Sequence, residues 1–274
     1  MFSPYYAKAG WADPLDHCTM NVALYGPRGG LWSPGWAMTE RGRGDLVQET
    51  TTLQIGPSSL SWEGDCLVVR LDETTTPVPS GLRGTIRLHP QALVDRTFQI
   101  GGAGSHEWRP IAPRAAVEVS LEQPGVSWKG QGYFDTNGGD SPLERAFSIW
   151  NWSRAHRARD TLIFYEVESD FGEGAKLALK IDSNGEVEAL EPPPPLHSLL
   201  PTFWLMPRHV RGDAADPPRI RRTCEDAPFY TRTALDGMVL GERAEIMHES
   251  LSAKRLRSAI VKRMLPYRMP RRVG

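Results

Sequence analysis

The chain has 274 residues, of which 40% are hydrophobic and 24% charged, as is typical of a globular protein with a sizeable core. The net charge is −1, but residues 252–272 hold eight basic residues and no acid, which leaves the remainder at −9. A basic segment of this kind suits anionic lipid or nucleic acid. Nucleic acid is disfavoured, because no nucleic-acid-binding motif accompanies the charge.

The sequence contains no segment that predicts secretion or a membrane span. The N-terminus, MFSPYYAKAG, lacks a basic region followed by an apolar core, so we expect no signal peptide. The longest apolar patch, SLLPTFWLMP, has ten residues and is interrupted by proline, which is too short for a transmembrane helix. The three cysteines are scattered and odd in number, which fits a reducing compartment. We therefore expect an intracellular protein.

Short alternating segments separated by Gly, Pro, Asn and Asp dominate the chain. They predict strands or hairpins at residues 59–73, 82–90, 115–135, 161–169 and 175–190. In the last of these, Asn184-Gly185 lies between two apolar runs, which is a strong hairpin signal. The spacing favours antiparallel sandwiches or barrels over a parallel sheet. The predicted fold class is mainly β.

Helical periodicity is scarce, and its best example lies near the C-terminus. A helix is predicted over residues 251–264, before Pro266, with one apolar face formed by Leu251, Leu256, Ile260, Val261 and Met264. Its basic residues form either a solvated face or a surface that lies on a membrane. The run Pro192–Pro195 is a stiff connector, read as a domain linker or, preferably, as a long loop inside a second domain.

The common catalytic motifs are missing from the sequence. There is no GxSxG elbow, P-loop or HExxH motif, and the seven histidines show no metal-ligand spacing. We therefore expect chemistry that needs no metal and no cofactor.

One strand carries an acid among aromatic rings. If residues 126–135 are extended, Tyr133 and Asp135 share one sheet face, while Trp128 and Phe134 lie on the other. Upstream, His106 and Trp108 would also share a face. Each pair places a polar group beside a ring. From the pattern alone a plainer interpretation stays open, in which Asp135 is a turn residue before TNGG and His106 a loop histidine.

Six stretches carry a resemblance to a known family. They are FSPYYAKAG, DPLDHCTMNVALYGP, WAMTERGRG, GYFDTNGGDSPLE, FSIWNWSRA and MLPYRMPRR. Together, in this order from residue 2 to residue 272, they resemble the carotenoid 1,2-hydratase family, also called hydroxyneurosporene synthase. The resemblance implies two lipocalin-like antiparallel β-barrel or sandwich domains, residues 1–122 and 123–274, with a short C-terminal helix.

The resemblance also implies an activity and a site. Members add water across the terminal C1–C2 double bond of acyclic carotenoids such as neurosporene and lycopene, without a cofactor. The family's proposed catalytic set falls here on His106, Trp108, Tyr133 and Asp135. The expected partners are a carotenoid, water and peripheral contact with the cytoplasmic face of a membrane. Two alternatives remain open, a carotenoid- or isoprenoid-binding carrier without catalysis and an isoprenoid cyclase.

Hydration of an alkene explains why these residue types are needed. Protonation at C2 leaves a tertiary cation at C1, which water captures. A free Asp titrates near ~3.9, but burial among rings disfavours its charged form, so Asp135 is the expected general acid. The rings of Trp108 and Tyr133 would stabilise the cation by roughly 0.5–2 kcal/mol each. His106 would orient or deprotonate the water, and the Tyr133 hydroxyl has the alternative role of holding Asp135 protonated.

Overall fold

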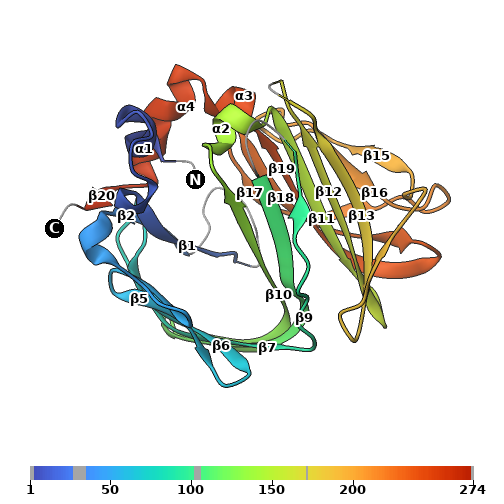
Figure 1. Cartoon of the computed structure of the whole chain (residues 1–274), viewed down its shortest axis with the longest axis horizontal. Coiled ribbons are helices and arrows are strands. Elements are labelled where there is room, and N and C mark those ends of the chain that lie inside the picture. Colours follow the sequence, from blue (N-terminus) through green and yellow to red (C-terminus); the bar gives the residue numbers. More distant parts are fainter. Residues whose placement is uncertain (1–2, 27–34, 102–105, 171, 273–274) are drawn as a thin grey trace.

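The structure is a computed structural model and describes residues 3–26, 35–101, 106–170 and 172–272. It is built mainly from antiparallel strands, as predicted, with short helices gathered at one end (Figure 1). Each of the five alternating segments forms a strand or a hairpin. At the Asn184-Gly185 turn, the Asp182 carboxylate accepts the backbone N–H groups of Asn184 and Glu186, which fixes the predicted hairpin.

The first large sheet contains most of the N-terminal half. Its order is β10-β9-β7-β6-β5-β4-β3, and β8 pairs with β9. The strands are β3 (Leu46–Gln48), β4 (Thr52–Ile55), β5 (Ser58–Glu63), β6 (Cys66–Thr74), β7 (Gly81–Pro90), β8 (Phe98–Gln99), β9 (His106–Gln123) and β10 (Val126–Gly139). A small sheet of β1 (Cys18–Leu24), β2 (Gly35–Arg41) and β20 (Arg271–Arg272) packs on it through Met20, Leu71 and Leu82.

The second large sheet contains most of the C-terminal half. Its order is β14-β13-β12-β11-β19-β18-β17. The strands are β11 (Ile149–His156), β12 (Asp160–Glu168), β13 (Ala175–Asp182), β14 (Val187–Ala189), β17 (Arg219–Asp226), β18 (Tyr230–Val239) and β19 (Glu242–Ser252). A separate hairpin of β15 (Leu196–Leu199) and β16 (Arg208–Arg211) covers part of it, with Val210 packed into a core that contains Phe164 and Leu235.

The helices are all short. They are α1 (Pro4–Lys8), η1 (Pro14–Asp16), η2 (Arg43–Asp45), α2 (Leu143–Ala146), α3 (Ala253–Leu256), α4 (Ala259–Met264) and η3 (Leu265–Tyr267). The prediction of one helix over residues 251–264 is wrong. Residue 251 belongs to β19, and the Ser252 and Ser258 hydroxyls each cap a separate helix by accepting a backbone N–H. Ile260 therefore lies outside the core and is 72% exposed.

The long β9–β10 hairpin connects the two halves of the molecule (Figure 1). One of its faces packs in the first half, where Phe134 joins Leu67 and Leu88. Its other face contributes Trp108 to a core shared with Ile163 on β12. The predicted domain boundary between residues 122 and 123 falls at the end of β9, beside the turn into β10, which pairs with β9. The division into two domains stays a prediction.

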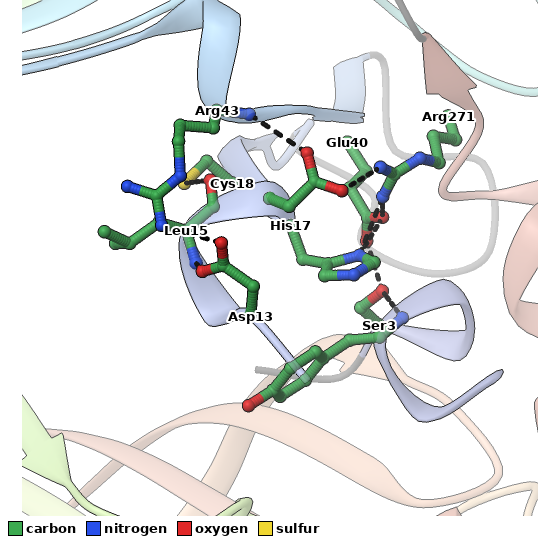
Figure 2. Close-up of polar contacts among 10 residues, drawn as sticks. Ser3, Asp13, Leu15, His17, Cys18, Glu40, Arg43 and Arg271 are labelled. Carbon is green, nitrogen blue, oxygen red and sulfur yellow. Dashed lines mark hydrogen bonds and ion pairs between the residues drawn. The ribbon is translucent and has the colours of Figure 1, made fainter. Parts of the chain in front are cut away.

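The two ends of the chain meet at a buried glutamate on β2. The Glu40 side chain is fully buried and accepts hydrogen bonds from Ser3, near the N-terminus, and from Arg271, on β20 (Figure 2). The His17 Nδ1 atom lies 2.8 Å from the same carboxylate. Buried charges are stable only when paired and hydrogen-bonded. Glu40 therefore holds α1 and β20 against the small sheet.

Replacing Glu40 tests this connection. We expect Glu40→Gln to lower the free energy of unfolding by about 3–5 kcal/mol, because it removes the buried carboxylate of a largely buried Arg271 and leaves only the half-exposed Asp16 as its acidic partner. Arg43→Gln is the control, since Arg43 forms an exposed pair with Asp13 in the same region and its loss should have a small effect. Urea denaturation of both variants measures the difference, and equal effects would contradict the role given to Glu40.

Candidate active site

Asp135 lies on β10, on the face that is turned toward the second large sheet. The register of β10 against β9 shifts on either side of Phe134, which marks two local irregularities in the ladder. Phe134 packs against Trp62 on the first half's side, with ring centroids 6.4 Å apart. Tyr133 packs instead against Trp152 on β11, at 5.1 Å. Tyr133 and Asp135 therefore share one face, as the alternation predicts.

Three of the four predicted site residues meet at one carboxylate oxygen. The Trp108 indole Nε1–H donates to Asp135 Oδ2 at 2.7 Å, and the Tyr133 hydroxyl donates to the same oxygen at 2.9 Å. Trp108 is paired with Asn137 across the hairpin, so Asp135 is its diagonal neighbour on β10, a position within reach of a long side chain. The hairpin register thus brings the two sequence pairs, His-x-Trp and Tyr-x-Asp, together.

Burial dominates the electrostatics of Asp135. It raises the pKa of this carboxyl above its usual value, although the Trp108 and Tyr133 hydrogen bonds favour the charged form. The negative charge of Glu249 raises the pKa further, and the Arg154 cation opposes this effect. Burial likewise raises the pKa of Tyr133 well above its ordinary value, so its hydroxyl stays a donor. The site therefore favours a neutral carboxylic acid.

His106 lies on the same face but does not bind Asp135 directly. Its Nε2 atom is 2.9 Å from Ser141 Oγ, and its ring packs on Phe147 with centroids 4.8 Å apart. The ring lies over Gly139, where an added Cβ would clash with the imidazole. Burial lowers the pKa of His106, which keeps the imidazole neutral. The histidine is thus placed two positions along β9 from Trp108.

The structure adds residues that the sequence analysis did not single out. The Tyr165 ring on β12 packs between Trp108, at 5.1 Å, and Trp150, at 5.9 Å, and its hydroxyl donates to Asn137 at 2.7 Å. The Arg154 guanidinium lies 5.1 Å from the centre of the Tyr133 ring. Trp150, Trp152 and Arg154 alternate along β11, in the stretch FSIWNWSRA. That period of two was the signal available in the sequence.

A cavity of about 300 Å³ lies beside this aromatic group, between the small sheet and the second large sheet. Its lining is mostly aromatic and aliphatic and is formed by Asn21, Ala23, Tyr25, Trp36, Met38, Trp150, Glu225, Ala227, Phe229, Tyr230, Arg232, Glu249, Leu265, Arg268 and Met269. Trp150 belongs both to this lining and to the ring stack that leads through Tyr165 to Trp108. The cavity is thus linked to the group around Asp135 through Trp150 and Tyr165, while its lining contains none of the four predicted site residues.

One wall of the cavity carries a second polar group. The Tyr25 hydroxyl donates to Glu225 Oε2 at 3.0 Å, and Arg232 donates to Tyr25 and, at 2.9 Å, to Glu249. Burial raises the pKa of Glu225, while the Arg232 cation opposes the rise. An apolar cavity with a few convergent polar groups is typical of a small-molecule site.

Across residues 3–26, 35–101, 106–170 and 172–272, no group of three or more His, Cys, Asp or Glu side chains is arranged to hold a metal ion. Within the same ranges, no helix is both long enough and apolar enough to cross a bilayer.

Among solved structures, kievitone hydratase from Nectria haematococca has a similar fold. The TM-score is 0.53 at 12% sequence identity, covering 86% of this chain and 84% of that chain. CghA bound to Sch210972 gives a TM-score of 0.50 at 11% identity, covering 89% of this chain and 82% of that one. At these identities the similarity shows the fold alone, which is the lipocalin-like β fold expected from the sequence.

The fold defines the class of the protein as a β-rich, lipocalin-like protein. More narrowly, the chain belongs to the carotenoid hydratase CrtC family, whose model matches residues 1–274. The chain is 46% identical over 274 residues to the acyclic carotenoid 1,2-hydratase of Thiocapsa roseopersicina, covering 99% of this chain and 67% of the relative. It is 38% identical over 275 residues to the Cereibacter sphaeroides enzyme of that name, covering 100% of this chain and 96% of the relative. The protein is therefore a hydro-lyase.

The burial of Asp135 predicts how stability depends on pH. Because the pKa of Asp135 is raised in the folded state, ionisation of this carboxyl lowers the free energy of unfolding at pH values above that pKa. This loss of stability disappears as the pH falls toward ~3.9, the pKa of an aspartate in the unfolded chain. Asp135→Asn keeps an acceptor oxygen for Trp108 and Tyr133. We expect the variant to be at least as stable as the unaltered protein at about pH 8, with the difference shrinking toward about pH 4.

Urea denaturation over this pH range measures the effect. Asp95→Asn is the matched control, because the Asp95 side chain is 94% exposed and carries no burial cost. A variant that is less stable than the unaltered protein at high pH, with the same pH dependence, would contradict the role given to burial.

Proposed function

We propose that the protein adds water across the terminal C1–C2 double bond of acyclic carotenoids such as neurosporene and lycopene. The supporting observation is the Asp135 carboxyl, half-buried among rings and hydrogen-bonded by Trp108 and Tyr133. The relatives that match along the chain carry the name acyclic carotenoid 1,2-hydratase, which supports this substrate class.

The two donors decide which oxygen of Asp135 carries the proton. Both bind Oδ2 and occupy its two lone pairs, so the proton of the neutral acid lies on Oδ1. Burial keeps the proton in place at pH values where a free carboxyl is ionised. Asp135 Oδ1–H is therefore the proposed general acid. The proton passes to alkene carbon C2, the π electrons form the new C–H bond, and the carboxylate stays bound by Trp108 and Tyr133.

The cation left at C1 needs stabilisation and a water molecule. Tyr133 and Trp108 adjoin the acid through their donor groups, and a cation placed over either π face would gain roughly 0.5–2 kcal/mol. His106 lies two residues along β9 from Trp108, on the same strand face and roughly 7 Å away along an extended strand. The neutral imidazole would hold this water and accept a proton as its oxygen bonds to C1.

The neighbouring cavity is the proposed place for the part of the carotenoid next to its reacting end. Its volume of about 300 Å³ is at the small end of ligand sites, so it suits a short part of the molecule while the remaining polyene extends outward. Its rings, Trp36 and Trp150 among them, would pack on the apolar chain. Because carotenoids dissolve in bilayers, the enzyme would collect its substrate by peripheral contact with a membrane.

Loss of the acid should abolish turnover. We expect Asp135→Asn to lower hydration of lycopene or neurosporene by roughly 10²–10⁴-fold or more while carotenoid binding persists, because the amide cannot supply the proton. Product analysis in ¹⁸O-labelled water measures the reaction, since hydration places the label in a tertiary alcohol and cyclisation does not. Asp95→Asn is the control. Near-normal turnover by Asp135→Asn would refute the assignment, and absence of alcohol from the unaltered protein would refute the function.

Loss of the imidazole should affect turnover more than binding. We expect His106→Phe, which preserves an aromatic ring against Phe147, to lower turnover by roughly 10²-fold with little change in carotenoid affinity. His89→Phe, at an exposed position on β7, is the control. Single-turnover rates and carotenoid absorbance titrations separate the two quantities. Equal losses in both would argue against a water-handling role.

A further inference from the structure

The longest apolar patch of the sequence forms a surface loop. Residues 200–205, here called the apolar loop, join β15 to β16. Leu200 is 78% exposed, Phe203 79% and Leu205 68%. Single exposed apolar residues are ordinary, but three large ones within six positions mark a surface that binds something.

The apolar loop is held in a defined conformation. The buried Arg208 side chain donates to the Leu200 carbonyl at 3.1 Å, and the Phe203 N–H donates to the Asp226 carboxylate at 2.9 Å. Arg255 on α3 donates to the Trp204 carbonyl at 2.6 Å and to the Leu205 carbonyl at 2.9 Å. These bonds satisfy the backbone of the loop, so its apolar side chains point outward from a fixed base.

The backbone conformation at Leu205 indicates that holding these apolar side chains outward costs conformational free energy. Its φ of 55° lies in the left-handed region, which a bulky side chain rarely adopts. Such conformations persist where the surroundings enforce them, and they gather at functional sites. Asn or Gly would fit this position with less strain, yet the chain has a large apolar residue there.

A second set of exposed apolar side chains follows α3 directly. On α4 and η3, Ile260 is 72% exposed, Met264 40% and Tyr267 77%, at positions i, i+4 and i+7 of the segment. We call these three residues the apolar stripe. The neighbouring Val261 is buried in the core that also contains Leu256 of α3. The apolar stripe therefore continues from the helix whose Arg255 holds the apolar loop.

Basic residues surround these two sets. Lys254 on α3 and Arg263 on α4 are both exposed, in the segment 252–272, which contains no acid, although Lys254 also pairs with Asp170 at 3.1 Å. Other basic residues of this segment have internal partners: Arg271 binds Glu40, and Lys262 lies 2.9 Å from Glu144. Fewer basic side chains are thus available for docking than the sequence suggests, and the exposed apolar side chains are the main feature of this surface.

The surface adjoins the cavity described above. Arg255 also donates to the Pro228 carbonyl at 3.3 Å, and the residues on either side of Pro228, Ala227 and Phe229, line the cavity. Leu265, which follows α4, lines it too. One arginine therefore connects the apolar loop to a wall of the cavity.

We propose that the apolar loop and the apolar stripe form the surface by which the protein binds a membrane containing anionic lipids. Apolar side chains would enter the acyl boundary, and Lys254 and Arg263 would contact headgroup phosphates. A second copy of the chain fits less well, because pairing this surface with itself would bring like charges together. That the cavity then receives its ligand from the bilayer rests on the proposed function, while the membrane contact itself does not.

Vesicle binding without substrate tests the proposal. We expect the unaltered protein to cosediment with vesicles of phosphatidylcholine and phosphatidylglycerol. The double variant Phe203→Ser/Leu205→Asn should bind them roughly tenfold more weakly, since two anchoring side chains are lost. Asn tolerates the left-handed backbone at position 205, so the variant should fold, which a thermal melt checks. Leu93→Asn is the matched control, because Leu93 is 58% exposed and lies beside the distant Asn184-Gly185 turn.

The outcomes separate this proposal from the proposed function. Weaker vesicle binding by the double variant, with hydration of detergent-solubilised carotenoid retained, supports the membrane surface. Unchanged vesicle binding overturns it, whether or not the protein hydrates carotenoids. A change from oligomer to monomer in light scattering, with vesicle binding unchanged, also overturns it and makes the surface a contact between copies. If the unaltered protein forms no alcohol yet binds vesicles through the loop, the proposed function fails and the membrane surface stands.

Discussion

The burial of one carboxyl group between two sheets is the constraint on which the site depends. Asp135 reaches that position because the β9–β10 hairpin belongs to the first large sheet while one of its faces packs on the second. Trp108 and Tyr133 then enclose the same oxygen. Removing a carboxyl from water raises its pKa, whereas an exposed turn aspartate would be ionised. The packing of the two sheets thus keeps the Asp135 carboxyl away from water, which supports its proposed role as the acid.

The fold class could be predicted from the sequence because a strand with one buried face alternates between apolar and polar side chains. The hairpin at Asn184-Gly185 and the strands around Leu67 and Phe164 were predicted for this reason. The helix over residues 251–264 was not correct, since periodicity alone cannot see that Ser252 and Ser258 end one element and cap the next. Strands such as β18 and β19 were missed because their polar residues point toward buried partners.

The site was predictable to the extent that it lies within one hairpin. Alternation placed Tyr133 with Asp135 and His106 with Trp108, and family resemblance brought the two pairs together. Contributions from other strands could not be read in this way. Tyr165, Arg154 and Glu249 approach from β12, β11 and β19, and only the pairing of these strands brings them near Asp135. Long-range sheet register is not encoded in any local pattern.

The cavity region contains two tyrosine–carboxyl pairs, and their charges differ in a way that favours one as the acid. Glu225 is bonded by Tyr25 as Asp135 is by Tyr133, and burial raises the pKa of both carboxyls. For Glu225 the strongest neighbouring charge is the Arg232 cation, which stabilises the carboxylate. For Asp135 it is the anion of Glu249, which opposes ionisation and outweighs Arg154. The neighbouring charges therefore make Asp135 better suited than Glu225 to the proposed role of proton donor.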